Sequence, residues 1–278
     1  MRTAVITIIK LSKYIYINPL TIILFAVCWF NRHLEMMCAA YSAMLLHETA
    51  HLAAALLIGL KPSYMCFQPF GVNLRLKNRI VYSLSDEIIL YLSGPLTNII
   101  LSLAALILSV KTGNPLADFF YKENIALFIM NMLPVFPLDG GIILKKIISY
   151  KTGSQLAEKI TKAISIVIIL CITVFLAYGA YTSGFNYSAL FLAVFLIANI
   201  FTQKEKYNVD VLKEIMFYRQ KEYKNKKIRL KVCSADGDMH ELVSGFRNDS
   251  FYIIILLSSD GSIDEILTET LLIDRILA

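Results

Sequence analysis

Charged residues are scarce in this chain of 278 residues, and its cysteines follow no paired spacing. Only 17% of the residues are charged, whereas a soluble domain has about 25%. The five cysteines are scattered and odd in number, which argues against a disulfide framework. These shortages exclude a typical soluble enzyme and a small disulfide-bonded secreted protein.

Apolar residues take the place of the missing charges. They make up 57% of the chain, and the mean hydropathy is +0.61, which excludes a disordered protein. Six apolar stretches are each long enough for a helix to cross a hydrocarbon core of about 30 Å. We therefore expect an all-α polytopic membrane protein with about six transmembrane helices, which span Tyr14–Phe30, Met36–Leu60, Ile88–Val110, Asn124–Leu144, Ala163–Ser183 and Phe185–Thr202.

The basic residues predict how these helices are oriented. With the N-terminus in the cytosol, twelve basic residues before the tail lie on cytosolic segments and three, Arg32, Lys111 and Lys122, lie on outer loops. The positive-inside rule then predicts that both termini are cytosolic. The first stretch contains Asn18 and Pro19 and leads directly into the second, so we interpret it as a span and not as a cleaved signal peptide.

The net charge of +6 divides unevenly along the chain. Residues 1–202 form the predicted membrane domain, residues 203–231 a basic linker and residues 232–278 an acidic module. Ten basic and four acidic residues fall in the linker, against two basic and nine acidic residues in the module. This distribution indicates membrane topology and no nucleic-acid partner. The linker either lies on anionic membrane lipid or forms a solvated amphipathic helix.

One motif inside the second stretch carries metal chemistry. His47-Glu48-Thr49-Ala50-His51 places two imidazoles one turn apart on one helix face. Such a pair can bind one zinc ion, and Glu48 beside it can take a proton from a water molecule at the metal. Ionisable residues within an apolar span are costly to bury and usually mark function. The alternative is a pair of core histidines hydrogen-bonded between helices.

A catalytic zinc ion requires a third protein ligand. The remaining histidines, His33 and His240, lie at the edge of an outer loop and in the terminal module. Asp139 is the better candidate, because it follows Pro134 and Pro137, which break the fourth stretch. Broken backbone at membrane depth is tolerated where it lines a protein-enclosed or watery cavity. The alternative is that Asp139 only caps the helix that resumes at Gly140.

Together these motifs resemble the site-2 protease family of intramembrane zinc metalloproteases. The resemblance rests on His47-Glu48-x-x-His51, on Asn131-x-x-Pro134-x-x-Pro137-x-Asp139-Gly140, and on Gly94-Pro95-Leu96-Thr97-Asn98. It implies that His47, His51 and Asp139 are ligands of Zn²⁺ and that Glu48 is the general base for attack on a peptide carbonyl. It also implies that Asn131 and Pro137 position the substrate or the loop.

The spacing of the motifs, the six spans and the tail are similar to the stage IV sporulation protein FB branch of that family. This resemblance implies regulated cleavage of an inactive sigma-factor precursor in an endospore-forming bacterium. It further implies membrane inhibitor or regulatory proteins as partners, and a location in the membrane around a developing forespore.

The segment Lys61–Ser85 connects the second and third stretches. Loosely alternating apolar residues flank Pro69-Phe70-Gly71, which predicts a hairpin. Proteolysis needs an extended substrate, and an exposed strand edge can pair with it. We therefore expect this hairpin either to dock the substrate or to serve as an ordinary connector or re-entrant loop.

The sequence of the terminal module predicts a small α/β fold with the order strand, helix, strand, strand, helix. These elements span Ile228–Cys233, Met239–Phe246, Tyr252–Leu257, Ile263–Leu267 and Glu269–Leu277. The pattern is similar to a single CBS motif, and a full CBS domain uses two. The resemblance implies a homo-oligomer through this module and an adenine nucleotide such as ATP as a ligand, while a purely oligomerising or substrate-docking module is the alternative.

Two rival functions follow from the same sequence. A transporter or metal or nucleotide sensor with a regulatory tail would need ligands along a path and inverted repeats, and the sequence has one compact cluster and no evident repeat. A membrane-anchored scaffold would keep its activity in the isolated module. The presence of Glu48 favours the protease hypothesis, because a site that only binds a metal needs no base beside its ligands.

Overall fold

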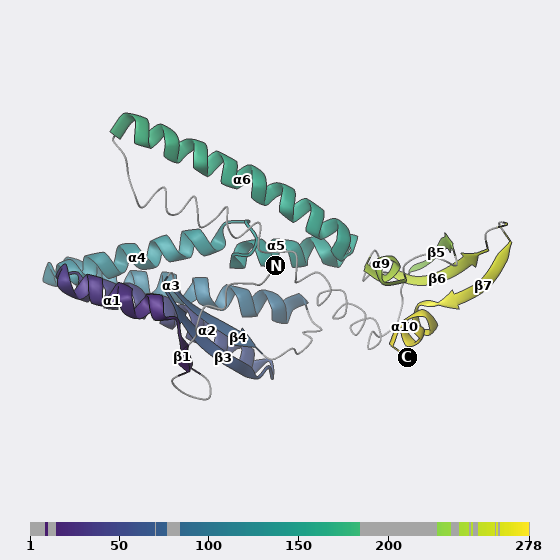
Figure 1. Cartoon of the computed structure of the whole chain (residues 1–278), viewed down its shortest axis with the longest axis horizontal. Helices are drawn as coiled ribbons and strands as arrows, with labels where there is room; N and C mark the ends of the chain where they lie inside the picture. Colours follow the sequence, from purple (N-terminus) through teal and green to yellow (C-terminus); the bar gives the residue numbers. More distant parts are fainter. Residues whose placement is uncertain are drawn as a thin grey trace. The chain divides into compact units, whose positions relative to one another are not determined.

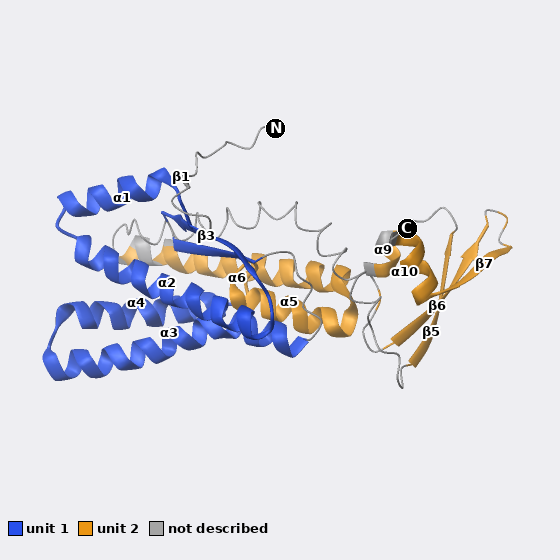
Figure 2. Ribbon diagram, turned by 90° about the horizontal axis from the view of Figure 1, so that it is seen from below, with its two compact units in different colours: residues 1–133 blue, residues 134–278 orange. Residues whose placement is uncertain are grey.

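The structure is a computed structural model of the chain (Figure 1). It divides into two compact units, residues 1–133 and 134–278, coloured blue and orange in Figure 2. The unit boundary falls inside the predicted membrane domain. The sixth apolar stretch and most of the basic linker lie outside the described residues, which are 9–10, 15–69, 71–76, 84–183, 227–234, 239–244, 246, 250–258, 260 and 262–277.

The first apolar stretch splits into a strand and a short helix. Strand β2 covers Ile15–Ile17, and helix α1 covers Pro19–Phe30. Asn18 separates them: its side chain accepts a hydrogen bond from the Leu20 N–H, and Pro19 occupies the first helical position. The helix has 12 residues, fewer than the roughly 20 that a straight span needs.

The predicted hairpin is confirmed. Strand β3, Pro62–Gln68, pairs antiparallel with strand β4, Gly71–Leu76. Strand β2 joins β3 in parallel, and β1, Ile9–Lys10, pairs with β2, so the sheet order is β1-β2-β3-β4. The carbonyl of Phe67 accepts hydrogen bonds from the Asn18 N–H and the Thr21 hydroxyl. These bonds fix β3 to the start of α1.

Three long helices pack together in the first unit. They are α2, Leu34–Leu57, α3, Leu84–Thr112, and α4, Pro115–Met132. Helices α3 and α4 lie side by side in Figure 2. Small and polar residues of α3, including Gly94, Asn98 and Ser102, are buried, whereas Ile100 and Ile107 are exposed. Such an arrangement suits helices that face lipid.

Unit 2 begins with a broken helical region. The fourth apolar stretch stops being helical after Met132 and resumes as α5, Asp139–Thr152, which confirms the break predicted from Pro134 and Pro137. Gly153 connects α5 to α6, Ser154–Ser183. Among the described residues, two helices are long and apolar enough to cross a membrane: α3 and the Ser154–Leu176 part of α6.

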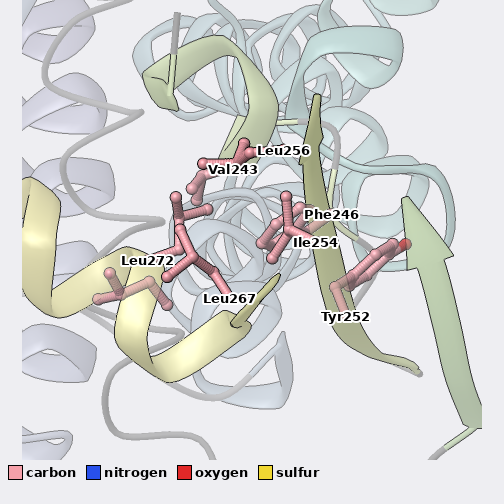
Figure 3. Close-up of a cluster of buried hydrophobic side chains, with 8 residues drawn as sticks. Val243, Phe246, Tyr252, Ile254, Leu256, Leu267 and Leu272 are labelled. Atoms are coloured by element: carbon pink, nitrogen blue, oxygen red, sulfur yellow. The ribbon is translucent and has the colours of Figure 1, made fainter. Parts of the chain in front are cut away.

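The terminal module has the predicted order of elements. Strands β5, Lys227–Ser234, β6, Ser250–Leu257, and β7, Ile263–Thr268, form a sheet in the order β5-β6-β7. Helices α9, Met239–Ser244, and α10, Glu269–Leu277, complete it. Figure 3 shows its buried core, where Phe246 stacks on Tyr252 with ring centroids 4.3 Å apart. The similarity to a CBS motif stays a prediction.

Candidate metal centre and active site

Helix α2 presents the two motif histidines on one face. Both side chains are buried, and their Nε2 atoms lie 3.1 Å apart. Residues four apart on a helix lie one above the other, so the spacing alone brings the rings together. The groups around each Nδ1 decide which tautomer the neutral ring adopts, and the tautomer decides what the ring nitrogens can bind.

A directed chain of hydrogen bonds fixes the tautomer of His47. The Asn124 Nδ2 donates to the carbonyl of Phe120 at 2.8 Å, and carbonyls only accept. Asn124 must therefore offer its Oδ1 to the Asn98 Nδ2, at 2.9 Å. Asn98 in turn offers its Oδ1 to the Nδ1 of His47, which must donate. The Nε2 of His47 then carries a lone pair.

His51 is fixed in the same tautomer by α3. Its Nδ1 lies 2.7 Å from the carbonyl oxygen of Leu90 and 3.2 Å from the hydroxyl of Ser93. Since a carbonyl only accepts, Nδ1 is protonated and Nε2 presents a lone pair. Backbone and side-chain acceptors of this kind orient metal-binding histidines and raise their basicity.

The pair fits a cation. Two Nε2 lone pairs at 3.1 Å repel each other unless a proton or a metal cation lies between them, and tetrahedral zinc holds its nitrogen ligands about 3.3 Å apart. Gly94 keeps this space open: a Cβ atom there would lie 2.5 Å from the Nε2 of His51 and 2.7 Å from that of His47. The residues present therefore suit a zinc ion.

Asp139 is the first residue of α5, and a fixed turn precedes it. The N–H of Phe136 donates to the Ser165 hydroxyl of α6 at 2.9 Å. Gly141 is required beneath the turn, because a Cβ atom there would lie 2.3 Å from the carbonyl carbon of Val135. Leu138, and not Asp139, is the N-cap of α5. With His47 and His51, Asp139 forms a candidate metal-binding group whose ligand atoms lie within 4.8 Å of one another.

Glu48 is held by the hairpin. Its Oε2 accepts a hydrogen bond from the main-chain N–H of Leu74 in β4, at 3.1 Å. The hydroxyl of Tyr41 on the same helix donates to the carbonyl of Gln68 at the end of β3. Helix α2 and the hairpin are thus connected at both the tip of the hairpin and the Glu48 carboxylate.

The remaining predicted site residues lie on either side of the helix break. Asn131 is in the last turn of α4 and donates through its Nδ2 to the Leu127 carbonyl at 3.0 Å. Pro137 follows Phe136 through a cis peptide bond. The positioning roles expected for these two residues stay predictions.

Sequence reasoning missed several residues that support the site. Asn124 accepts from Asn98, the partner of His47. Ser93 contacts His51, and Ser165 accepts from the turn. The available signal is their polarity within apolar helices, which usually requires a partner. Sequence alone does not supply the partner.

Comparisons with known proteins find related metalloproteases. Residues 114–176 match the sequence pattern of peptidase family M50, a region that contains Asp139. The chain is 23% identical over 256 residues to stage IV sporulation protein FB of Bacillus subtilis, with 91% of this chain and 88% of that protein covered. The chain is therefore similar to the site-2 proteases of peptidase family M50.

Two archaeal matches extend this similarity. A zinc metalloprotease of Methanocaldococcus jannaschii is 29% identical over 139 residues, which covers 47% of this chain and 40% of that protein. The solved structure of the site-2 protease from Methanocaldococcus jannaschii shares the fold with a TM-score of 0.55 at 23% identity, over 71% of this chain and 94% of that one. Together, the sequence matches indicate a zinc metalloendopeptidase of the site-2 type.

Proposed function

We propose that this protein cleaves a membrane-associated precursor protein, with His47, His51 and Asp139 as the zinc ligands and Glu48 as the general base. The observation that carries the proposal is the histidine pair itself. Both Nδ1 atoms donate to fixed acceptors, so both Nε2 lone pairs converge. Gly94 leaves room for an ion where they meet. Asp139 adds an anionic oxygen ligand at the start of α5.

The chemistry follows from these positions. Zinc supplies polarisation of the scissile carbonyl and a lowered pKa of the attacking water. Glu48 takes a proton from that water as its oxygen bonds to the carbonyl carbon. Glu48 then gives the proton to the amide nitrogen as the C–N bond breaks, which leaves a new carboxyl group and a new amine. Asn131 and Pro137 position the substrate or the turn beside this centre.

The substrate class rests on the sporulation relative. Its name places that protein in stage IV of sporulation, and we infer a sigma-factor precursor as the substrate here. The proposed location is the membrane around a developing forespore, with membrane inhibitor proteins as regulators. Six spans with both termini in the cytosol remain the proposed topology, for which the described apolar helices α3 and α6 are partial support.

The decisive experiment replaces only the base. Full-length wild type and Glu48→Gln are co-expressed with a membrane-associated sigma-factor precursor, and both are analysed for bound zinc. We expect Glu48→Gln to keep its zinc and to lose cleavage by about 10²–10⁴-fold, the usual contribution of a general base. Cleavage by Glu48→Gln at the wild-type rate would overturn the mechanism. Zinc analysis of Asp139→Ala tests the third ligand separately.

We further propose that the hairpin docks the substrate as an added strand. Strand β4 is the terminal strand of the described sheet, and its N–H at Leu74 reaches Glu48. A photo-crosslinking residue at Asn73, which is exposed, should label the precursor in the Glu48→Gln background. The matched control is the same residue at Arg32, between α1 and α2. Equal labelling at both positions would contradict docking at β4.

The terminal module is proposed to associate with a second copy. Ile228, Leu230 and Val232 alternate along β5 and are all more than half exposed. The strand register aligns them with Phe251, Ile253 and Ile255 of β6, so they form one apolar sheet face. An uncovered apolar face of this kind marks an association site. Binding of an adenine nucleotide to the module stays a further prediction.

Self-association is measured on the full-length protein in detergent by light scattering. Leu230→Glu should lower the oligomeric state if the sheet face is the interface. Leu271→Glu is the control, because Leu271 is exposed on α10, the helix whose Leu272 and Ile273 pack in the core. An unchanged mass for Leu230→Glu would refute the assembly through β5.

A further inference from the structure

The Glu48 carboxylate is held by the main chain of the hairpin. Its Oε2 accepts from the N–H of Leu74 at 3.1 Å, across 26 residues of sequence. Glu48 follows His47 directly in α2, so any movement of its side chain changes the distance between the base and the metal-binding face. The hairpin therefore sets the position of the base.

The strand register shows that this N–H belongs to the outer side of β4. In an antiparallel pair, residues alternate between those that exchange hydrogen bonds with the partner strand and those whose N–H and C=O point away. Leu74 lies opposite Met65, and its N–H donates to Glu48 instead of to β3. By the same alternation along β4, we expect Leu76, two residues further along, to point its N–H to the same side. Loss of the Leu74 N–H thus leaves the β3–β4 ladder intact.

We propose that the main-chain N–H of Leu74 is a positioning group for the general base, which holds Glu48 oriented toward the attacking water. The proposal rests on the proposed role of Glu48. A carboxylate has two oxygens, so Oε2 can keep its bond to Leu74 while the other oxygen accepts the proton. The hairpin proposed to dock the substrate would then also hold the base, with the Leu74 N–H given to Glu48 and not to the substrate.

A proline in place of Leu74 tests the role of the Leu74 N–H while the strand is kept. Proline lacks an N–H and is tolerated on edge strands where that N–H faces away from the ladder. Leu74→Pro therefore removes the bond to Glu48, whereas Leu74→Ala removes the side chain and keeps the bond. Leu76→Pro is the matched control, since it makes the same change at an outward N–H two residues away.

Kinetics in detergent micelles with fluorescein-labelled casein, an unfolded protein, separate positioning from docking. We expect Leu74→Pro to lower kcat by about 10–100-fold with KM within about twofold, because small misplacements of reacting groups cost up to about 10²-fold. Zinc content should be unchanged, and Leu74→Ala and Leu76→Pro should retain wild-type kcat. A wild-type kcat for Leu74→Pro, or an increase in KM alone, would overturn the proposal.

Amide hydrogen exchange gives a readout that needs no substrate. In the full-length protein, Glu48→Ala should speed exchange at the Leu74 amide at least about tenfold, because this amide loses its acceptor. Exchange at Asn73, whose N–H belongs to the β3–β4 ladder, should stay the same. Unchanged exchange at Leu74 would refute the hydrogen bond. If Glu48→Gln keeps its activity, the proposed function fails, whereas an inactive Glu48→Gln beside an active Leu74→Pro refutes only this inference.

Discussion

The helices around the metal site and the terminal module are built in opposite ways. In α3, buried positions are small or polar, such as Gly94 and Asn98, and large apolar side chains such as Ile100 face outward. In the module, large apolar side chains such as Phe246 and Leu272 are completely buried. The hydrophobic effect drives packing only where water is the alternative. The contrast indicates that lipid surrounds the first region and water the second.

The interiors of the two regions also have different roles. The interior of the helical region holds hydrogen-bonded polar groups that orient two histidines. The interior of the module contributes stability through apolar burial. Substitutions that change size or polarity should therefore affect metal binding in the first region and folding in the second.

Gly94→Ala should have the largest effect on the helical region. Its methyl group would lie within 2.7 Å of both Nε2 atoms, where an ion would bind. We expect loss of bound zinc and of cleavage, while thermal unfolding stays close to that of the wild type. Metal analysis by mass spectrometry checks this, with Leu96→Ala, on the exposed side of α3, as the control. Full zinc occupancy in Gly94→Ala would show that the ion does not bind there.

Phe246→Ala should affect the module through folding. The ring is fully buried and stacks on Tyr252, and truncation of such a side chain costs about 3–5 kcal/mol. Limited proteolysis of the full-length protein should cut the module faster, while the zinc content stays unchanged. A large loss of zinc in this variant would break the proposed separation between the two regions.

Asn98→Ala should have an intermediate effect, on the metal site alone. It removes the acceptor of the His47 Nδ1 and leaves Asn124 with one partner fewer. Loss of such a supporting partner lowers metal affinity by about 10–100-fold. Competition with a chromogenic chelator measures this. Asn31→Ala serves as a control, since Asn31 donates to the Val27 carbonyl of its own helix and has no part in the site. Equal affinities for the two variants would contradict the directed chain.

Glu265→Gln should have the smallest effect. Glu265 pairs with Arg275 at 2.8 Å and 3.0 Å on the module surface, and exposed ion pairs contribute little to stability. We expect no measurable change in the urea midpoint of the module at physiological salt. A shift comparable to that of Phe246→Ala would mean that the module is stabilised by its surface and not by its core.

The sequence predicted the features that depend on local spacing. The histidine motif, the break at Pro134 and Pro137, the hairpin and the order of elements in the module all follow from neighbouring residues. The parallel pairing of β2 with β3, between residues such as Ile15 and Met65, was not predicted, because a three-residue strand carries almost no periodic signal. The roles of His47, Glu48, His51 and Asp139 stay predictions.

The partners of the site residues were beyond sequence reasoning for a different reason. Asn98 and Asn124 are 26 residues apart, as are Glu48 and Leu74. No local pattern specifies such pairs, because they depend on how α2, α3, α4 and β4 pack. Polar residues in apolar helices signal that a partner exists, but a main-chain donor such as Leu74 carries no signal at all.

A main-chain donor has a consequence for how this family diverges. If the Leu74 N–H orients the base, natural selection acts at this position on the backbone and is indifferent to the side chain. Relatives could carry almost any amino acid there, and an alignment of their sequences would show a variable position that suggests no function. Only proline would be missing from it.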